Sequence, residues 1–433
     1  MAIIPQISMF VWENDIENLG DLARLDLVLS NLPDERLMRK LEKQRGNGRN
    51  DFPVRAMWNL TIAMVVFGHP KFAGALRELA RNVQLRYICG FMNGKIPSSA
   101  NMSRFVSKLK KEKKEVKRVF KELVKQIYIE IPDFGKDVAI DSKWVWSMAS
   151  KVSDRKNADA RSEQDASWGI KEYSGIREDG SAWSKIERCF GFKIHALVDA
   201  IYELPIAYSI GRASEPDIVA GKVLMSGLEK DSPDIIEKCE HFMGDRGYDD
   251  TDFIRMLKGM RIKAVIDKRD MWRTEPERPL VGYDRMYYDE RGEVYCYSPE
   301  AGERHRMIPS GYESGRDSLR MRCPVIAYGA ACCEAETCTL CKTIRVPLAT
   351  EERIFTQVAR PSYKWERLYN KRTSVERVFS RLDVSFGFET RRVRGMEKME
   401  LISALGLIVM NAMALGRIKQ KKPDMMRSLT QAA

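Results

Sequence analysis

Three carboxylate residues have the type and the placement to hold divalent metal: Asp141, Asp245 and Glu376. Each aspartate ends a short apolar run, at 137–141 and at 241–245, of the kind that predicts a β-strand. Glu376 lies within a predicted helix. Sites in open α/β sheets collect where the strands end, and carboxylate oxygens are the ligands that Mg²⁺ prefers. We therefore expect Mg²⁺ or Mn²⁺ to be bound by these residues.

Such a site suits the cleavage and transfer of phosphodiester bonds. The reaction needs an activated water or 3′-hydroxyl and a stabilised leaving oxygen, and two metal ions about 3.5–4 Å apart supply both. An aspartate at a strand end is, taken alone, more often a turn residue than a catalytic one. The order of all three carboxylates along the chain favours the catalytic interpretation.

The predicted helix around Glu376 carries further polar residues on the same face. Tyr369, Arg372, Glu376 and Asp383 follow one another at spacings of 3, 4 and 7 residues, which places them on one side of a helix. Arginines here can grip phosphates with paired hydrogen bonds. Between 360 and 394 the chain has ten basic and four acidic residues, which favours DNA contact over a salt-bridged surface helix.

The composition agrees with a soluble protein that binds a polyanion. The 433 residues allow two or three domains, and 73 basic against 61 acidic residues give a net charge of +12. No secretory signal is visible at the start of the sequence. The most apolar run, 401–415, is shorter than the roughly 20 residues that cross a bilayer. We expect a buried helix there and a cytoplasmic protein with no membrane contact.

The elements that must position the carboxylates form an α/β pattern. Residues 1–130 are predicted to be helical, with one long basic helix at 102–128. A polar stretch, 150–188, is predicted to be a loop. Three sequential strands, a helix, a strand, a helix and a strand then predict a mixed sheet, an antiparallel meander followed by helical crossovers. Those elements are expected at 137–141, 189–199, 204–210, 216–229, 241–245, 251–260 and 262–266.

Cysteines gather in the stretch that interrupts this pattern. Six of the nine lie between Cys296 and Cys341. Cys338 and Cys341 have the Cys-x-x-Cys spacing of a structural zinc site, and Cys323 and Cys333 can complete it. Because no second Cys-x-x-Cys is present, free and partly buried thiols are an equal alternative.

Four sequence blocks together resemble the DDE transposases of bacterial insertion sequences, whose core is RNase H-like. These are Val138-Ala-Ile-Asp-Ser-Lys, Gly191-Phe-Lys-Ile-His-Ala-Leu-Val-Asp, Gly244-Asp-Arg-Gly-Tyr-Asp and Tyr369-x-x-Arg-x-x-x-Glu. The helical stretch from Asp51 to Phe105 is also similar to the N-terminal part of that group. The resemblance covers most of residues 30–418, and the second and fourth blocks are the most specific.

The resemblance implies a role for each matching residue. Asp141, Asp245 and Glu376 correspond to the catalytic metal-binding triad. Tyr369 and Arg372 correspond to helix positions that contact the terminal phosphates.

Other DNA contacts follow less directly from the resemblance. Trp272 is a candidate for the insertion-domain tryptophan that stacks on a flipped base in some relatives. The family's usual lysine seven residues after the glutamate is Asp383 here. Its contact is therefore missing or supplied elsewhere, with Arg381 as a candidate, and Arg377 is a further DNA-binding candidate.

We therefore predict a transposase that cleaves and joins double-stranded DNA at terminal repeats and target sites, as a homodimer when DNA is bound. Two alternatives are a transposase-derived DNA-binding protein without activity and a metal-dependent nuclease on the same fold. The predicted fold is an RNase H-like mixed α/β sheet flanked by helices. Its parts are a helical DNA-binding domain (1–130), the core (131–269), a Cys-rich insertion (270–350), the core's C-terminal helices (351–420) and a basic tail (421–433).

Overall fold

A mixed β-sheet forms the centre of the computed structural model, which describes residues 19–45, 52–92, 94–148, 162–177, 179–272, 275–298, 303–332, 338, 342–389 and 393–429. Strands β4, β3 and β1 are antiparallel, whereas β1, β5 and β6 are parallel. Their bounds are β1 (Asp137–Trp146), β3 (Ala182–Asp199), β4 (Pro205–Arg212), β5 (His241–Gly244) and β6 (Lys263–Ile266). This arrangement confirms the predicted meander followed by crossovers.

The strand sequences explain this order. Every residue of β5 is buried, as are three of the four in β6, and short continuous apolar runs are typical of parallel strands covered on both faces. Helices α9 (Asp217–Asp231) and α11 (Thr251–Gly259) supply the predicted crossovers, and a short α10 (Pro233–Lys238) follows α9.

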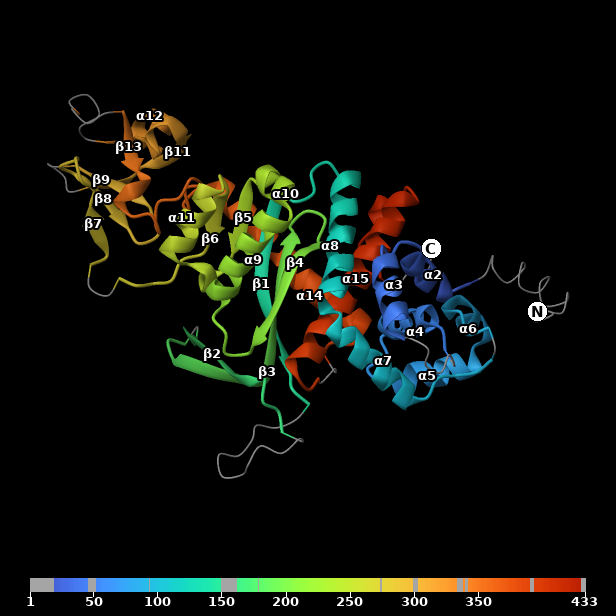
Figure 1. Ribbon diagram of the computed structural model, residues 1–433. Helices are drawn as coiled ribbons and strands as arrows, with labels where there is room; N and C mark the ends of the chain where they lie inside the picture. Colours follow the sequence, from blue (N-terminus) through green and yellow to red (C-terminus); the bar gives the residue numbers. More distant parts are fainter. Residues whose placement is uncertain are drawn as a thin grey trace.

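Helices cover both faces of the sheet. Ile194 is the register partner of Lys143, so the neighbouring Lys193 points to the opposite face. Lys193 contacts Asp217 of α9, whereas Lys143 contacts Asp383 of α14 (Thr373–Phe386). Helices α9 and α14 therefore pack on opposite faces, and Figure 1 shows the sheet between them.

Within the described residues of the N-terminal part, seven helices pack at one end of the sheet (Figure 1). They are α2 (Leu22–Ser30), α3 (Glu35–Arg45), α4 (Val54–Val66), α5 (Phe72–Arg81), α6 (Val83–Cys89), α7 (Ser99–Lys111) and α8 (Lys113–Glu130). The single helix predicted at 102–128 is wrong, because α7 ends at Lys111 and α8 begins at Lys113. Between them, the buried Glu112 carboxylate binds Lys40 of α3 at 2.6 Å, which fixes the break.

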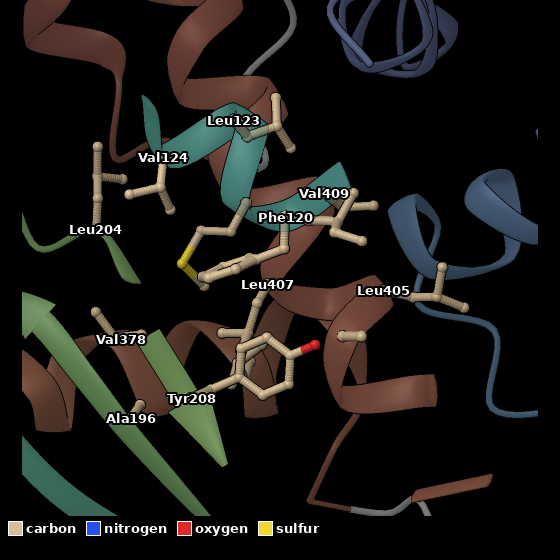
Figure 2. Packing of buried hydrophobic residues seen from close by; sticks show 14 of the residues in the cluster. Phe120, Leu123, Val124, Ala196, Leu204, Tyr208, Val378, Leu405, Leu407 and Val409 are labelled. Carbon is tan, nitrogen blue, oxygen red and sulfur yellow. The ribbon is translucent and has the colours of Figure 1, made fainter. Parts of the chain in front are cut away.

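The C-terminal helix α15 (Met396–Lys419) joins these helices to the sheet. Figure 2 shows Leu407 and Val409 of α15 close to Phe120 of α8 and Tyr208 of β4. The rings of Phe120 and Tyr208 lie edge to face, with centroids 5.0 Å apart. At 24 residues α15 is long and apolar enough to cross a bilayer. The prediction that the apolar segment at 401–415 is too short for this is therefore wrong, because the helix extends beyond it on both sides. Because 94% of its most apolar window is buried, α15 serves as a core helix.

The loop predicted at 150–188 is also wrong in its second half. Strand β2 (Ser167–Ile176) pairs with the first half of β3 to form a long hairpin, from Ser167 opposite Gly191 to Ile176 opposite Ala182. Polar residues alternate here with large apolar ones such as Ile170 and Ile186, and both of these are exposed. Because neither face is covered, the composition resembles that of a loop although the backbone is paired.

The described strands between residues 277 and 347 form two small sheets at the other end of the molecule (Figure 1). One contains β7 (Glu277–Pro279), β8 (Met286–Asp289), β9 (Val294–Tyr297) and β10 (Arg304–Arg306). The other contains β11 (Ile308–Glu313), β12 (Ser318–Arg322) and β13 (Thr343–Pro347), with α12 (Pro324–Tyr328) beside it. A separate hydrophobic cluster that includes Met286, Leu319, Ile344 and Phe355 holds them together.

Candidate active site

The parallel pairing of β1 and β5 brings Asp141 and Asp245 together. The prediction that the first strand ends at Asp141 is wrong, because β1 continues to Trp146 and Asp141 lies in its middle. Ala139 pairs with Met243, and each aspartate follows two residues later. Because side chains alternate along a strand, both carboxylates leave the sheet on the same side. Asp245 directly follows β5, where its Oδ1 accepts a hydrogen bond of 2.9 Å from the Gly247 N–H.

The electrostatics of Asp141 reflect two negative charges in a buried place. Burial, helped by the charge of Asp245, raises the pKa of Asp141 to about 6. The hydrogen bond from the Ser142 N–H and the positive charges of Arg372 and Lys171 oppose this shift. A cation beside the carboxylates would relieve the repulsion that raises the pKa.

Arg372 connects Glu376 to this pair of aspartates. Its Nη1 lies 3.3 Å from Asp141 Oδ2 and its Nη2 lies 2.8 Å from Glu376 Oε1. One guanidinium therefore lies between two of the three predicted ligands. Glu376 itself is in the first turn of α14, and its side chain is 51% exposed.

The three carboxylates do not form a closed cage. Among the described residues, no three His, Cys, Asp or Glu side chains are arranged to hold a metal ion. The donor set nevertheless fits a divalent cation, because Asp141 and Asp245 are partly buried carboxylates close enough for the charge of Asp245 to raise the pKa of Asp141. Glu376 can reach toward the two aspartates because its side chain is half exposed.

Tyr369 lies beside this arginine but on a separate helix. The single helix predicted to carry both Tyr369 and Glu376 is interrupted, because α13 (Tyr363–Tyr369) ends in a short 3₁₀ turn before α14 begins. The ring of Tyr369 stacks on Trp365 with centroids 4.6 Å apart. The Arg372 guanidinium lies 5.7 Å from the Tyr369 ring centroid, so the two predicted phosphate contacts are neighbours.

Comparison with known families decides what kind of protein carries this site. A profile described as a transposase DDE domain matches residues 152–412. The chain belongs to the DDE transposase family. A second profile, described as a transposase domain (DUF772), matches residues 12–108. No curated protein matches the chain. The first match includes Asp245 and Glu376 and begins after Asp141.

The transposase has a lysine at its site that the sequence did not single out. Lys143 lies two residues after Asp141, on the same face of β1, and its Nζ is 2.5 Å from Asp383 Oδ2. Burial raises the pKa of Asp383, and the charge of Lys143 opposes that shift. The acidic residue at the family's lysine position is thus paired with a lysine from the sheet. A search for a compensating basic residue near Asp141 could have found it.

A second set missed in the sequence lies on the other face of β1. Asp217 of α9 is 3.1 Å from Lys193 Nζ and 3.6 Å from His195 Nδ1. His195 is fully buried, which lowers its pKa to about 4. Ser142, adjacent to Asp141, hydrogen-bonds to Asp217. These residues brace the strand behind Asp141, and the period-two spacing of Lys193 and His195 was the available signal.

Two predicted DNA-binding arginines of the transposase point elsewhere. Arg377 Nε lies 2.6 Å from Glu203 Oε1, and Arg381 Nη2 lies 3.4 Å from Glu203 Oε2. Arg427 makes a third ion pair with the same carboxylate at 3.3 Å. Arg381 is only 15% exposed, whereas Arg377 is 52% exposed and keeps one side open to solvent.

Trp272 is packed into the insertion. Its ring meets Tyr288 edge to face at 5.7 Å, and the Arg278 guanidinium lies 4.0 Å from its centroid. In this state, its ring is a partly buried member of the small hydrophobic cluster. Stacking on a flipped base, the role implied by the resemblance, would require it to leave these contacts.

Two of the four cysteines predicted to bind zinc lie in the part of the chain that the structure describes. Cys323 precedes α12 and Cys338 is exposed, while Cys333 and Cys341 lie outside the described residues. Burial raises the pKa of Cys296 to about 11, and nearby Cys338 and Cys323 add to that shift. A cysteine that the prediction left out therefore lies in the same neighbourhood, and zinc binding stays a prediction.

Proposed function

We propose that this transposase cleaves DNA strands and transfers them to a target, with Mg²⁺ or Mn²⁺ held by Asp141, Asp245 and Glu376. The observation that carries the proposal is the register of β1 and β5, which sets two aspartates side by side within reach of a glutamate helix. When bound, the metal ions would activate the attacking hydroxyl and stabilise the leaving oxygen. The strand order β4-β3-β1-β5-β6 supports an RNase H-like core.

The chain's own residues do the remaining work in this proposal. Arg372 holds Glu376 near Asp141. If Glu376 binds the metal instead, the guanidinium of Arg372 becomes free to bind a phosphate. Tyr369 limits the directions that Arg372 can take. The Asp217 and His195 set keeps β1 in place from behind.

The partners and location follow from the same chemistry. The substrate would be double-stranded DNA, bound at terminal repeats and at a target, in the cytoplasm. The net charge of +12 supports this partner. We infer the same division as above: a DNA-binding part at 1–130, a core at 131–269 and 351–420, an insertion at 270–350 and a basic tail at 421–433. A structural zinc in the insertion remains part of the proposal.

The deciding experiment compares the wild type with Asp245→Asn on DNA that carries the element's own ends. We expect Mg²⁺-dependent cleavage and joining to fall more than about a thousandfold, with DNA binding kept. Asp252→Asn is the matched control, because Asp252 is 75% exposed on the following helix. Equal cleavage by both variants would overturn the assignment of the triad.

The same assay separates the alternatives. Cleavage without joining to a target would indicate a nuclease on this fold. Binding without cleavage by the wild type, on verified ends, would indicate a transposase-derived protein that no longer reacts.

A further inference from the structure

The β2–β3 hairpin presents an uncovered apolar face. Side chains alternate along both strands. One face therefore carries Trp168, Ile170, Glu172 and Ile176 of β2 together with the β3 residues that pair with them. We call the large exposed side chains of this side the hairpin face; they are Trp168, Ile170, Glu172, Ile176, Ile186 and Arg188, whereas Phe190 on the same side is buried. Its three isoleucines are 63%, 77% and 52% exposed in chain order, and Trp168 is 47% exposed.

Such a face is costly to leave in water. An isolated two-stranded hairpin is marginally stable, and soluble monomers seldom expose large contiguous apolar patches. Figure 1 shows β2 and the start of β3 extending away from the rest of the sheet. The hairpin therefore needs a partner surface to cover it.

The charge of the hairpin argues for a protein rather than DNA on this face. Residues 167–190 contain four basic and four acidic residues, so the segment is neutral in a chain of net charge +12. Affinity for DNA comes chiefly from an excess of Lys and Arg that replaces counterions on phosphates. A neutral face that combines four large apolar side chains with one acidic and one basic residue lacks that excess and suits a protein–protein interface better.

The pattern on the hairpin face complements itself. Ile170 pairs with Arg188, and Glu172 pairs with Ile186 in the next row on this face. The two isoleucines thus occupy one diagonal and the two opposite charges occupy the other. Neither Glu172 nor Arg188 makes an ion pair within the part of the chain that the structure describes.

A twofold axis along the isoleucine diagonal gives each of these four residues a matching partner. Ile170 and Ile186 each meet their own copies, and Arg188 meets Glu172 of the partner subunit twice by symmetry. With strands about 4.8 Å apart and rows about 6.8 Å apart, the two hairpins cross at roughly 70°, close to orthogonal sheet packing. We propose that the hairpin face is the contact between two copies of this chain. The contact needs no DNA and does not rest on the proposed chemistry.

Charge reversal with mixing tests this contact. Glu172→Arg and Arg188→Glu are purified separately, and their masses in solution are measured without DNA by light scattering over a range of concentrations. Each variant alone sets like charges against each other at both symmetric pairs, so we expect dimer dissociation constants at least tenfold above that of the wild type. An equimolar mixture restores both pairs, and we expect dimers to return.

The mixture is informative because a pair within one hairpin would not be restored by mixing. Lys185→Glu is the matched control, since Lys185 lies on the opposite face of the same strand and is 65% exposed. Ile170→Cys should also cross-link to its own copy on oxidation, well above the wild-type background, whereas Tyr173→Cys on the opposite face should not. Thermal unfolding of each variant checks that the fold is kept.

Three results would overturn the proposal. One is a wild type that stays monomeric at every concentration. Another is a mixture that dimerises no better than its two components. The third is a set of hairpin-face variants that keep the wild-type dimer and lose DNA binding, which would assign the face to DNA.

Discussion

Two ion clusters flank helix α14, and they are opposite in composition. On one side a single base, Arg372, lies among the acids Asp141, Asp245 and Glu376. On the other side a single acid, Glu203, is shared by three arginines: Arg377, Arg381 and Arg427. Both clusters connect α14 to the sheet, but only the first has a net negative charge.

The difference in net charge distinguishes a binding site from a structural contact between elements. At the first cluster, burial and then the negative charge of Asp245 raise the pKa of Asp141 to about 6, so the site gains from a metal cation. At the second cluster, Arg377 and Arg427 are about half exposed and water solvates their excess charge, while the buried Glu203 is fully paired. Charge balance, more than residue type, distinguishes the two.

Removing the single acid tests the structural side of this comparison and should have the largest effect. Glu203→Gln keeps the shape and leaves Arg381 buried without an opposite charge. We expect a loss of about 3 kcal/mol in the free energy of unfolding, at the low end for a broken buried pair because two partners are half exposed. Urea unfolding measures it. An unchanged midpoint would show that the arginines find other partners and that the cluster is not a structural contact.

Replacing Arg372, the arginine of the acidic cluster, tests the proposed binding site. Arg372→Gln takes away the cation that lies between Asp141 and Glu376. Cleavage should fall about 100-fold, or about 2.7 kcal/mol, because a phosphate contact is lost. Mn²⁺ should bind more tightly to the variant, since no guanidinium competes for the carboxylates; calorimetric titration checks this. Weaker Mn²⁺ binding would mean that Arg372 assembles the ligands.

Local patterns in the sequence predicted much of the first cluster. Asp141 and Asp245 each end an apolar run, and such runs predict strands and their order without knowledge of contacts. The spacing of Arg372 and Glu376 likewise predicted their shared face, and they form an ion pair. The resemblance supplied the family, which the profile match confirms. The break between α13 and α14 carried no comparable signal.

The second cluster could not be predicted, because its pairs join distant parts of the chain. Arg381 and Glu203 are 178 residues apart, and nothing in either neighbourhood indicates the other. Arg377 was therefore assigned to DNA from its place beside Arg372, and Arg381 from the lysine that the resemblance leads one to expect at Asp383. The hairpin at 167–190 was missed for a different reason: both of its faces are exposed, so polar and charged residues occupy both faces and its composition is that of a loop.

A third ion cluster, around Asp137 on the same strand β1 as Asp141, sharpens the comparison because its acid is paired with basic residues. Burial raises the pKa of Asp137, but hydrogen bonds from His241 and Lys371 outweigh it and lower the value from 3.8 to about 2. Ionised Asp137 therefore stabilises the fold above pH 4, and that stabilisation is lost as the pH falls toward 2. Asp137→Asn should cost about 2 kcal/mol at pH 7. Urea unfolding should show the two proteins converging at pH 2; a constant difference would contradict the shift.

The smallest expected effect concerns the lysine that borders the acidic cluster. Lys143 is held by Asp383, and its Nζ lies on the same face of β1 as Asp141. If its charge faces the DNA backbone, Lys143→Met should lower cleavage about tenfold, or about 1.4 kcal/mol. Because the substitution also leaves Asp383 unpaired, Lys143→Met combined with Asp383→Asn is measured beside it to remove that effect.

The exchange of the two residues separates position from charge. Lys143→Asp with Asp383→Lys moves the lysine onto α14, to the position that the resemblance assigns to a lysine. The pair is kept and the ammonium stays at the same boundary, so cleavage should recover to within a few fold of the wild type. Recovery would show that the site needs a positive charge here and accepts it from either element. If the exchanged protein folds and binds DNA but cleaves no better than Lys143→Met, the lysine acts only from β1, and its distance from Asp141 is what the reaction requires.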